Sequence, residues 1–272
     1  SVTEEQLIEK VCSEFDNVIV VINANNTMEL GWVDNYEQIK SVILAPGAGE
    51  TGFTALGEIL NGTVNPSGKT ADTYVKNLLS THYINNIGNF PYTNVDDLKA
   101  QALAADSSYK GNVSFVNYVE GIYVGYKFYE TAADEGLIDY ESSVQYPFGY
   151  GLSYTTFDYS ALKIENPVIG TQGSVKLSCR VKNTGKIAGD EVVQLYLHDE
   201  VSSVTTYVKV LRGFERIHLQ PGEEKVVDFV LTPQDMGLWN KDNHFIVEPG
   251  TFAVMVGSSS QDIRLQGKFE VK

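Results

Sequence analysis

Two short runs of aliphatic residues near the start of the chain predict strands that are buried on both faces. They are Val18–Ile22 and Ser41–Ala45, and polar residues hardly interrupt them. Such runs are typical of a parallel sheet that is covered by helices on both sides. We therefore expect the two strands to be adjacent and parallel, joined by a right-handed crossover.

Helical patterns surround these strands. Thr3–Gln6 has the form of a capping box with Thr3 as N-cap, and apolar residues then recur at helical spacing as far as Phe15. A short helix is expected over Trp32–Ile39, and another follows Pro46–Gly52 and stops at Gly62. Residues 1–75 are thus predicted to be a piece of a doubly wound α/β sheet. Two strands leave both faces and an edge open, which predicts that partner strands come from elsewhere.

The pattern changes twice further along the chain. Residues 76–157 form a long, largely polar connecting segment, with a short helix expected over Val95–Ala104 and another near 118–134. From residue 158 to residue 272 apolar and polar residues alternate, as in Val175, Leu177, Cys179 and Val181, and turn sequences such as Gln220-Pro221-Gly222 separate the runs. About seven short strands at regular spacing predict a β-sandwich.

The composition of the chain disfavours some classes of binding partner. The formal net charge of −15 disfavours nucleic acid and an anionic membrane as partners, because both require clustered Lys and Arg. No apolar run approaches 20 residues and no signal peptide is visible, so a soluble protein is expected, either cytoplasmic or secreted. Cys12 and Cys179 fall in different predicted domains and are expected to be buried, unpaired thiols.

Several motifs occur together in an order that no generic helix or strand pattern requires. They are Gly49-Glu50-Thr51-Gly52, Asn65-Pro66-Ser67-Gly68-Lys69, Tyr118-Val119-Glu120-Gly121-Ile122-Tyr123 through Glu130, Pro147-Phe148-Gly149-Tyr150-Gly151, Leu211-Arg212-Gly213-Phe214-Glu215-Arg216 and Val256-Gly257-Ser258-Ser259-Ser260-Gln261-Asp262. Over almost its whole length the chain resembles the C-terminal portion of family 3 glycoside hydrolases, the β-glucosidase and β-xylosidase family. The fold that this implies is an α/β fragment, the end of an (α/β)6 sandwich domain with a partial parallel sheet, followed by an all-β immunoglobulin/fibronectin III-like sandwich.

The resemblance implies retaining hydrolysis of a terminal β-linked sugar, with glucose as the expected sugar. In the family the nucleophile is an Asp of an N-terminal barrel domain and the acid/base is a Glu on an earlier loop of the second domain, so both are expected before Ser1. No catalytic residue is therefore assigned in this chain, and its expected role is to complete the second domain and shape the cleft. The implied partners are the barrel domain and the upstream half of the second domain, on the same or a separate chain, together with a carbohydrate substrate.

The remaining candidate residues have ordinary structural explanations. Glu29, Glu50 and Glu120 each stand near a predicted helix start, where the helix dipole favours a carboxylate. The four histidines and two cysteines lack metal-ligand spacing, and Gly47-x-Gly49-x-x-Gly52 lacks the context of a dinucleotide site, so neither a metal nor a cofactor is expected.

Aromatic residues in the irregular segment are the one candidate for contact with substrate. Tyr83, Phe90 and Tyr92 lie where exposed rings could form a sugar-binding rim. The alternative to an enzyme portion is a non-enzymatic carbohydrate- or protein-binding β-sandwich module. The incomplete α/β piece argues against that alternative, because a free-standing module would have no use for two parallel strands without partners.

Overall fold

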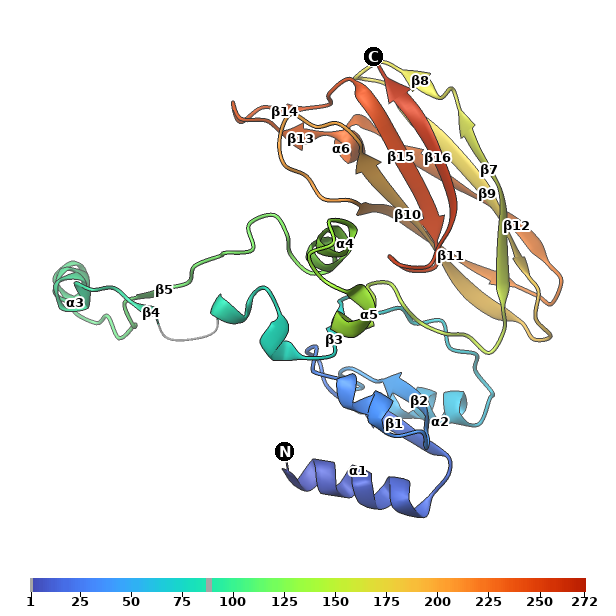
Figure 1. Cartoon of the computed structure of the whole chain (residues 1–272), viewed down its shortest axis with the longest axis horizontal. Coiled ribbons are helices and arrows are strands. Elements are labelled where there is room, and N and C mark those ends of the chain that lie inside the picture. Colours follow the sequence, from blue (N-terminus) through green and yellow to red (C-terminus); the bar gives the residue numbers. More distant parts are fainter. Residues whose placement is uncertain (1, 87–89) are drawn as a thin grey trace.

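The computed structural model describes residues 2–86 and 90–272. Figure 1 shows a small α/β unit at the N-terminal end, a β-sandwich at the C-terminal end, and a middle segment that runs between them and sends out a slender projection. The order of these parts is the one that the hydrophobic pattern predicts.

The N-terminal unit contains the two predicted parallel strands. Residues Val20 of β1 and Val42 of β2 are partners in the register, and Ile22 pairs with Leu44. The elements of the unit are α1 (Val2–Glu14), β1 (Val18–Ile22), η1 (Gly31–Asn35), β2 (Ile39–Leu44) and α2 (Phe53–Leu60). The predicted parallel pairing is confirmed.

Two local predictions in this unit are wrong. Helix α1 already includes Val2, so Thr3 lies inside the first turn and is not its N-cap. The helix expected over Trp32–Ile39 is a single 3-10 segment that ends at Asn35, because Tyr36 adopts an extended backbone and Ile39 already belongs to β2. The short 3-10 segment and the start of β2 therefore occupy the residues of the predicted crossover helix.

The apolar faces of the α/β unit are poorly covered. Ile19 of β1 is 51% exposed and Val21 is 38% exposed, on a strand whose composition calls for burial on both sides. Helix α2 buries none of its side chains. The two-stranded sheet thus has an open face, as its sequence predicts.

The middle segment is irregular but not structureless. Strand β3 pairs with β6, so the start and the end of the segment meet. Its elements are β3 (Tyr74–Val75), η2 (Leu78–Ser80), η3 (Ile84–Asn86), β4 (Phe90–Pro91), α3 (Val95–Ala105), β5 (Ser114–Phe115), α4 (Tyr126–Asp134), α5 (Tyr140–Ser143) and β6 (Val144–Tyr146). The helix predicted at Val95 is confirmed.

The helix predicted near 118–134 is shorter than expected. Helix α4 begins at Tyr126, and the residues before it form turns. Gly121 and Gly125 have φ angles of 56° and 60°, which the right-handed helix does not allow. Glycine is the residue that adopts this conformation most readily, and the two glycines end the helical path before Tyr126.

The sandwich is formed by a five-stranded and a three-stranded sheet. The first has the order β11-β10-β15-β16-β8 and the second has the order β12-β9-β7. The strands are β7 (Phe157–Glu165), β8 (Val168–Ile169), β9 (Val175–Asn183), β10 (Gly189–Asp199), β11 (Val210–Leu219), β12 (Glu224–Leu231), β15 (Gly250–Gly257) and β16 (Ile263–Val271). Burial alternates along β9, and Val175, Leu177 and Cys179 belong to one continuous core between the sheets. The predicted sandwich is confirmed.

A short helix and a hairpin stand at one end of the sandwich (Figure 1). They are α6 (Pro233–Met236) and the strands β13 (Leu238–Trp239) and β14 (Phe245–Ile246). Thr232 begins α6, and its backbone N–H and its hydroxyl both donate to the Asp235 carboxylate. This cap fixes the direction in which the hairpin leaves the sheet.

The two cysteines are unpaired and buried, as the sequence predicts. Cys12 lies on α1 and Cys179 lies on β9 in the sandwich core. Burial raises the pKa of the Cys179 thiol to about 11. Cys179 therefore behaves as a small apolar core residue.

Candidate functional site

Two of the three predicted rim residues lie together on the projection that the middle segment sends out. We call residues 90–118 the arm. Strand β4 pairs with β5, and the rings of Phe90 and Tyr92 lie 5.8 and 5.1 Å from the ring of Phe115. Tyr92 is 44% exposed, whereas Phe90 is half-buried. The antiparallel pair of β4 and β5 thus presents the Tyr92 ring at the surface.

Tyr83 belongs to a different cluster. It is half-buried, and its ring stands edge-on to the ring of His82 at 5.3 Å. His82 in turn stacks on Phe128 of α4, with ring centroids 3.9 Å apart. The structure therefore places Tyr83 beside α4 and the other two candidates on the arm.

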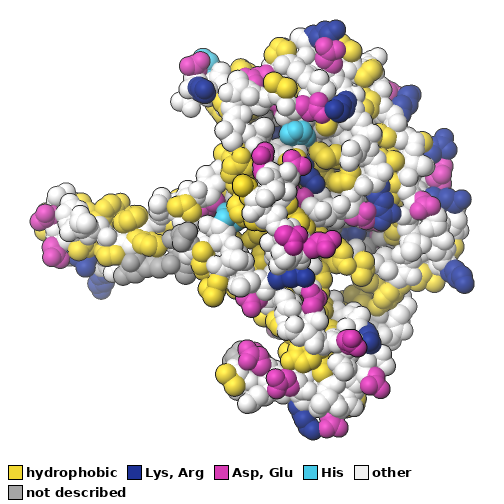
Figure 2. Space-filling view, viewed as in Figure 1, with side chains coloured by type: hydrophobic (Ala, Val, Ile, Leu, Met, Phe, Trp, Pro, Cys, Tyr) yellow, Lys and Arg dark blue, Asp and Glu magenta, His cyan; other side chains and the backbone are white. Residues whose placement is uncertain are grey.

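The arm carries apolar side chains that nothing in the described chain covers. Figure 2 shows them along the projection at the left of the view. The exposed members are Tyr92, Leu103, Phe115, Val116 and Tyr118. A projection of this composition is typical of a surface that contacts another body.

His82 is a half-buried base between the rings of Tyr83, Phe128 and Tyr129. Burial lowers its pKa below the ordinary value of 6.5, although a hydrogen bond with the Tyr123 backbone and the charge of Glu120 oppose the shift. Its Nδ1 is buried and has no hydrogen-bond partner among the residues that the structure describes. The folded protein thus holds His82 neutral.

We expect this neutral histidine to make the chain sensitive to acid. The pKa of His82 is lower in the folded than in the unfolded chain, so the unfolded state takes up the proton first and stability falls as the pH drops below about 6.5. His82→Phe keeps a ring against Phe128 and removes the titration. Urea unfolding between pH 5 and 8 gives the free energy of unfolding of the wild type and of H82F as a function of pH. The two curves should be parallel above neutrality and diverge below it, with the wild type losing more stability than H82F. The exposed His244 provides the control, since H244N should follow the wild type, and an identical acid response of H82F would contradict this account.

The three carboxylates that stand near predicted helix starts have structural partners or stand in solvent. Glu29 Oε2 accepts a hydrogen bond from the backbone N–H of Leu78 at 2.9 Å. Glu120 Oε2 accepts one from the Asn86 side chain at 2.5 Å. The structure corrects the expected position of Glu120, because α4 begins only at Tyr126. Glu50 is exposed in the turns before α2.

The most deeply buried ionic cluster surrounds a residue that the sequence analysis did not single out. Only 1% of the Glu130 side chain is exposed, and its Oε2 lies 3.0 Å from Nζ of Lys209. Oε1 accepts hydrogen bonds from Ser260 Oγ at 2.6 Å and from the Tyr140 hydroxyl at 3.0 Å. Gln261 donates to Oε2 as well. Every oxygen of this buried carboxylate is thus satisfied, which is the condition for a stable buried charge.

This cluster joins α4 to the sandwich. Lys209 also donates to the Ser260 backbone carbonyl at 2.8 Å, and both residues belong to the C-terminal sandwich region. Burial, followed by the neighbouring Glu130 carboxylate, raises the pKa of Tyr140, which therefore remains a hydrogen-bond donor. We call Glu130, Tyr140, Lys209, Ser260 and Gln261 the anchor cluster.

Further bonds from α4 to the start of β11 and to the residues just before it support the anchor cluster. The Tyr126 hydroxyl accepts from the backbone N–H of Leu211 at 2.9 Å, and Thr131 Oγ1 accepts from that of Val208 at 3.1 Å. The sandwich thus holds α4, and with it the turns that precede α4 and lead to the arm.

The Asn65–Lys69 segment is docked on the sandwich in a similar way. Asn65 accepts from the backbone N–H of Tyr154 at 2.8 Å and donates to the carbonyl of Ala188 at 3.0 Å. Lys69 donates to the Gly151 carbonyl at 2.9 Å and lies 3.2 Å from the buried Glu191 carboxylate. The motif is therefore an interface between the α/β unit and the sandwich.

The sequence contains a signal for the anchor cluster. Glu130 directly follows Tyr129 and lies four residues after Tyr126, so it shares the apolar face of α4. A carboxylate on a buried face needs a cation and hydrogen-bond donors. This signal predicts that Glu130 has a buried partner, but it does not identify that partner as Lys209 or Gln261.

Two negative findings apply to residues 2–86 and 90–272. They contain no group of three or more His, Cys, Asp or Glu side chains arranged to hold a metal ion. None of their helices is long and apolar enough to cross a membrane.

Comparisons with known proteins agree with the motifs. The family described as the glycosyl hydrolase family 3 C-terminal domain matches residues 2–154. The family described as a fibronectin type III-like domain matches residues 191–260.

The similar proteins include several β-glucosidases. Thermostable β-glucosidase B of Acetivibrio thermocellus is 38% identical over 98% of this chain, and β-glucosidase BoGH3A of Bacteroides ovatus is 36% identical over 98% of it. Among solved structures, β-glucosidase 3B of Thermotoga neapolitana in complex with α-D-glucose is 30% identical over 98% of the chain, with a TM-score of 0.79. The chain spans 31% and 32% of the two relatives and 33% of the solved chain, about a third of each.

Proposed function

The chain belongs to glycosyl hydrolase family 3, and from this membership we propose that it forms the C-terminal portion of a retaining β-glucosidase that releases terminal, non-reducing β-D-glucose. The observation that carries the proposal is the similarity along almost the whole chain to proteins named β-glucosidase. The similarity includes both the α/β unit and the sandwich, which argues against a free-standing binding module.

The two catalytic carboxyl groups that this function requires are proposed to lie outside this chain. A retaining glycosidase needs two carboxyl groups about 5 Å apart, one as nucleophile and one as acid/base. We assign them to a barrel domain and the upstream half of the α/β domain, on the same or a separate chain. The exposed apolar face of β1, including Ile19, supports a contact with such a partner.

Within this assignment the chain has a positioning role. The anchor cluster fixes α4 to the sandwich, and the Asn65–Lys69 segment fixes the α/β unit to the same sandwich. We propose that residues 1–75 complete the α/β domain, that residues 76–157 connect and shape the cleft, and that residues 158–272 form the supporting sandwich.

The proposed activity has a direct test. The full-length protein should hydrolyse p-nitrophenyl β-D-glucoside, with NMR showing β-glucose as the first product, whereas the 272-residue chain alone should show no turnover above buffer. Turnover by the chain alone that survives repurification would contradict the assignment of the carboxylates. A folded full-length protein that hydrolyses no β-glycoside would contradict the activity itself and favour a binding module.

We further propose that Tyr83, Phe90 and Tyr92 belong to the sugar-binding rim. Tyr92 offers the sharpest test because its ring is exposed and its removal leaves the core intact. In the full-length protein, Tyr92→Ala is expected to raise KM for cello-oligosaccharides about three- to tenfold with little change in kcat, the pattern of lost uniform binding. Phe214→Ala on the sandwich, where the ring is 66% exposed, is the matched control. Equal kinetics of Y92A and the wild type would remove Tyr92 from the rim.

A further inference from the structure

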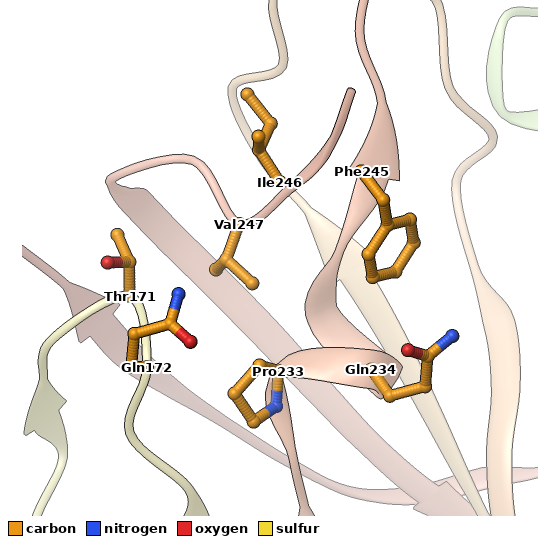
Figure 3. Close-up of a pocket in the computed structure, with 7 residues that line it drawn as sticks. All are labelled: Thr171, Gln172, Pro233, Gln234, Phe245, Ile246 and Val247. Carbon is orange, nitrogen blue, oxygen red and sulfur yellow. The ribbon is translucent and has the colours of Figure 1, made fainter. Parts of the chain in front are cut away.

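A pocket opens at the end of the sandwich that carries α6 and the β13–β14 hairpin. It has a volume of about 400 Å³, which is the size of a small-molecule site. Figure 3 shows Thr171 and Gln172 on one side, Pro233 and Gln234 at the base, and Phe245, Ile246 and Val247 above. Three separate segments thus meet around one hollow.

The two side-chain amides of this pocket are not used by the fold. The side-chain amides of Gln172 and Gln234 are exposed and make no hydrogen bond within residues 2–86 and 90–272. None of the seven lining residues carries a charge. Free amides offer both donors and acceptors, the combination that matches the hydroxyl groups of a neutral ligand.

An aromatic surface borders these amides. The ring of Phe245 lines the pocket and points toward Gln234 (Figure 3), and it packs so closely on Gly237 that a Cβ there would lie 2.4 Å from the ring. Trp239 is opposite Phe245 in the hairpin, with ring centroids 5.7 Å apart, and it is 65% exposed. An indole left in solvent beside a half-buried ring provides a flat apolar platform.

The loop of the hairpin holds this platform in place. The Asn240 side chain accepts hydrogen bonds from the backbone N–H groups of Asp242 at 2.9 Å and His244 at 3.0 Å. Asn243 adopts a positive φ of 57° to close the turn. The two rings are therefore presented by a fixed turn, which limits the entropy that binding would cost.

We propose that this pocket is a carbohydrate-binding site for a neutral pyranose oligosaccharide. The apolar face of one pyranose ring stacks on Trp239, and the hydroxyl groups of the next unit bond to the amides of Gln172 and Gln234. An acidic sugar is disfavoured, because the lining is uncharged and the chain has a net charge of −15. The hairpin lies apart from the arm in Figure 1, so the site does not depend on the rim residues or on the proposed glycosidase activity.

The full 272-residue chain can be tested with cellotetraose as the probe. The chain has two tryptophans, so Trp32→Phe leaves Trp239 as the sole indole reporter. Cellotetraose should cause a saturable change in the fluorescence of W32F, and calorimetry on the wild type should give the same dissociation constant. Trp239→Ala should weaken binding at least about tenfold, and Gln172→Ala and Gln234→Ala about fivefold each.

The controls separate this site from other sugar contacts. Phe214→Ala and Val230→Ala, which change exposed side chains of the sandwich outside the pocket, should bind cellotetraose as the wild type does, and all variants should keep the wild-type melting temperature. Absence of saturable binding at millimolar cellotetraose, or binding that W239A and Q234A leave unchanged, would overturn the proposal. Tighter binding of tetragalacturonate than of cellotetraose would overturn its neutral character. The assay measures binding without turnover, so its outcome is independent of the hydrolysis test.

Discussion

Replacement of Glu130 by alanine is expected to lower the free energy of unfolding by about 3–5 kcal/mol, the cost of breaking a buried ion pair on one side. The change leaves the ammonium of Lys209, which is only 13% exposed, without its 3.0 Å partner. It also removes the acceptor that Ser260, Tyr140 and Gln261 share. Urea unfolding followed by circular dichroism would measure the loss.

Two further variants distinguish the effect of the buried charge from a general effect of mutating α4. Glu135→Ala changes an exposed carboxylate at the end of the same helix and should alter stability by no more than about 0.5 kcal/mol. Combining Glu130→Leu with Lys209→Met should recover much of the loss, because a buried pair replaced by apolar residues leaves no unpaired charge. A loss below about 1 kcal/mol for E130A would mean that the anchor cluster contributes little to the docking of α4.

The sandwich and the parallel pair were predictable because their signals are local. Along β9, apolar side chains at every second position point into the core, and the alternation alone predicts this burial. The run from Val18 to Ile22 predicts a strand in the same way, and the pairing with β2 follows from the short connection. Such inferences require no knowledge of distant contacts.

The interfaces between the parts were not predictable to the same degree. Glu130 meets Lys209 and Ser260, residues that lie far away along the chain, and no local pattern specifies that meeting. The helix expected from Tyr118 onward fails for a local reason, since Gly121 and Gly125 adopt positive φ angles.

The rim candidates show a third case. Tyr92 and Phe90 are candidates because they are aromatic residues in an irregular segment, and the pairing of β4 with β5 brings both to Phe115. Tyr83 is a candidate for the same reason but lies beside His82. Composition thus identifies these aromatic residues as candidates, while their grouping depends on the pairing of two short strands, β4 and β5, that the sequence does not mark.

Gly149→Ala is expected to cost about 2–5 kcal/mol, because the substitution combines backbone strain with a collision in the core. Gly149 has a φ of 76°, and a Cβ there would lie 2.1 Å from Oε1 of Gln194. Gln194 is 3% exposed and cannot withdraw freely, since its amide donates to the carbonyls of Gly149 and Ser258 and its oxygen accepts from the Tyr196 hydroxyl. The backbone around Gly149 would have to move away from the Gln194 side chain of β10.

Gly222 provides a control with the same backbone and no collision. Its φ is 78°, and a Cβ there would meet nothing within 4 Å, so Gly222→Ala should cost only the left-handed strain of about 1–2 kcal/mol. The difference between the two variants in urea unfolding therefore isolates the contact with Gln194. Gln194→Ala in the G149A background should recover part of that difference, because it removes the atom that the new methyl group meets. Equal losses for G149A and G222A would show that the Gly149 turn needs glycine for its backbone alone and that its approach to the sandwich adds no constraint.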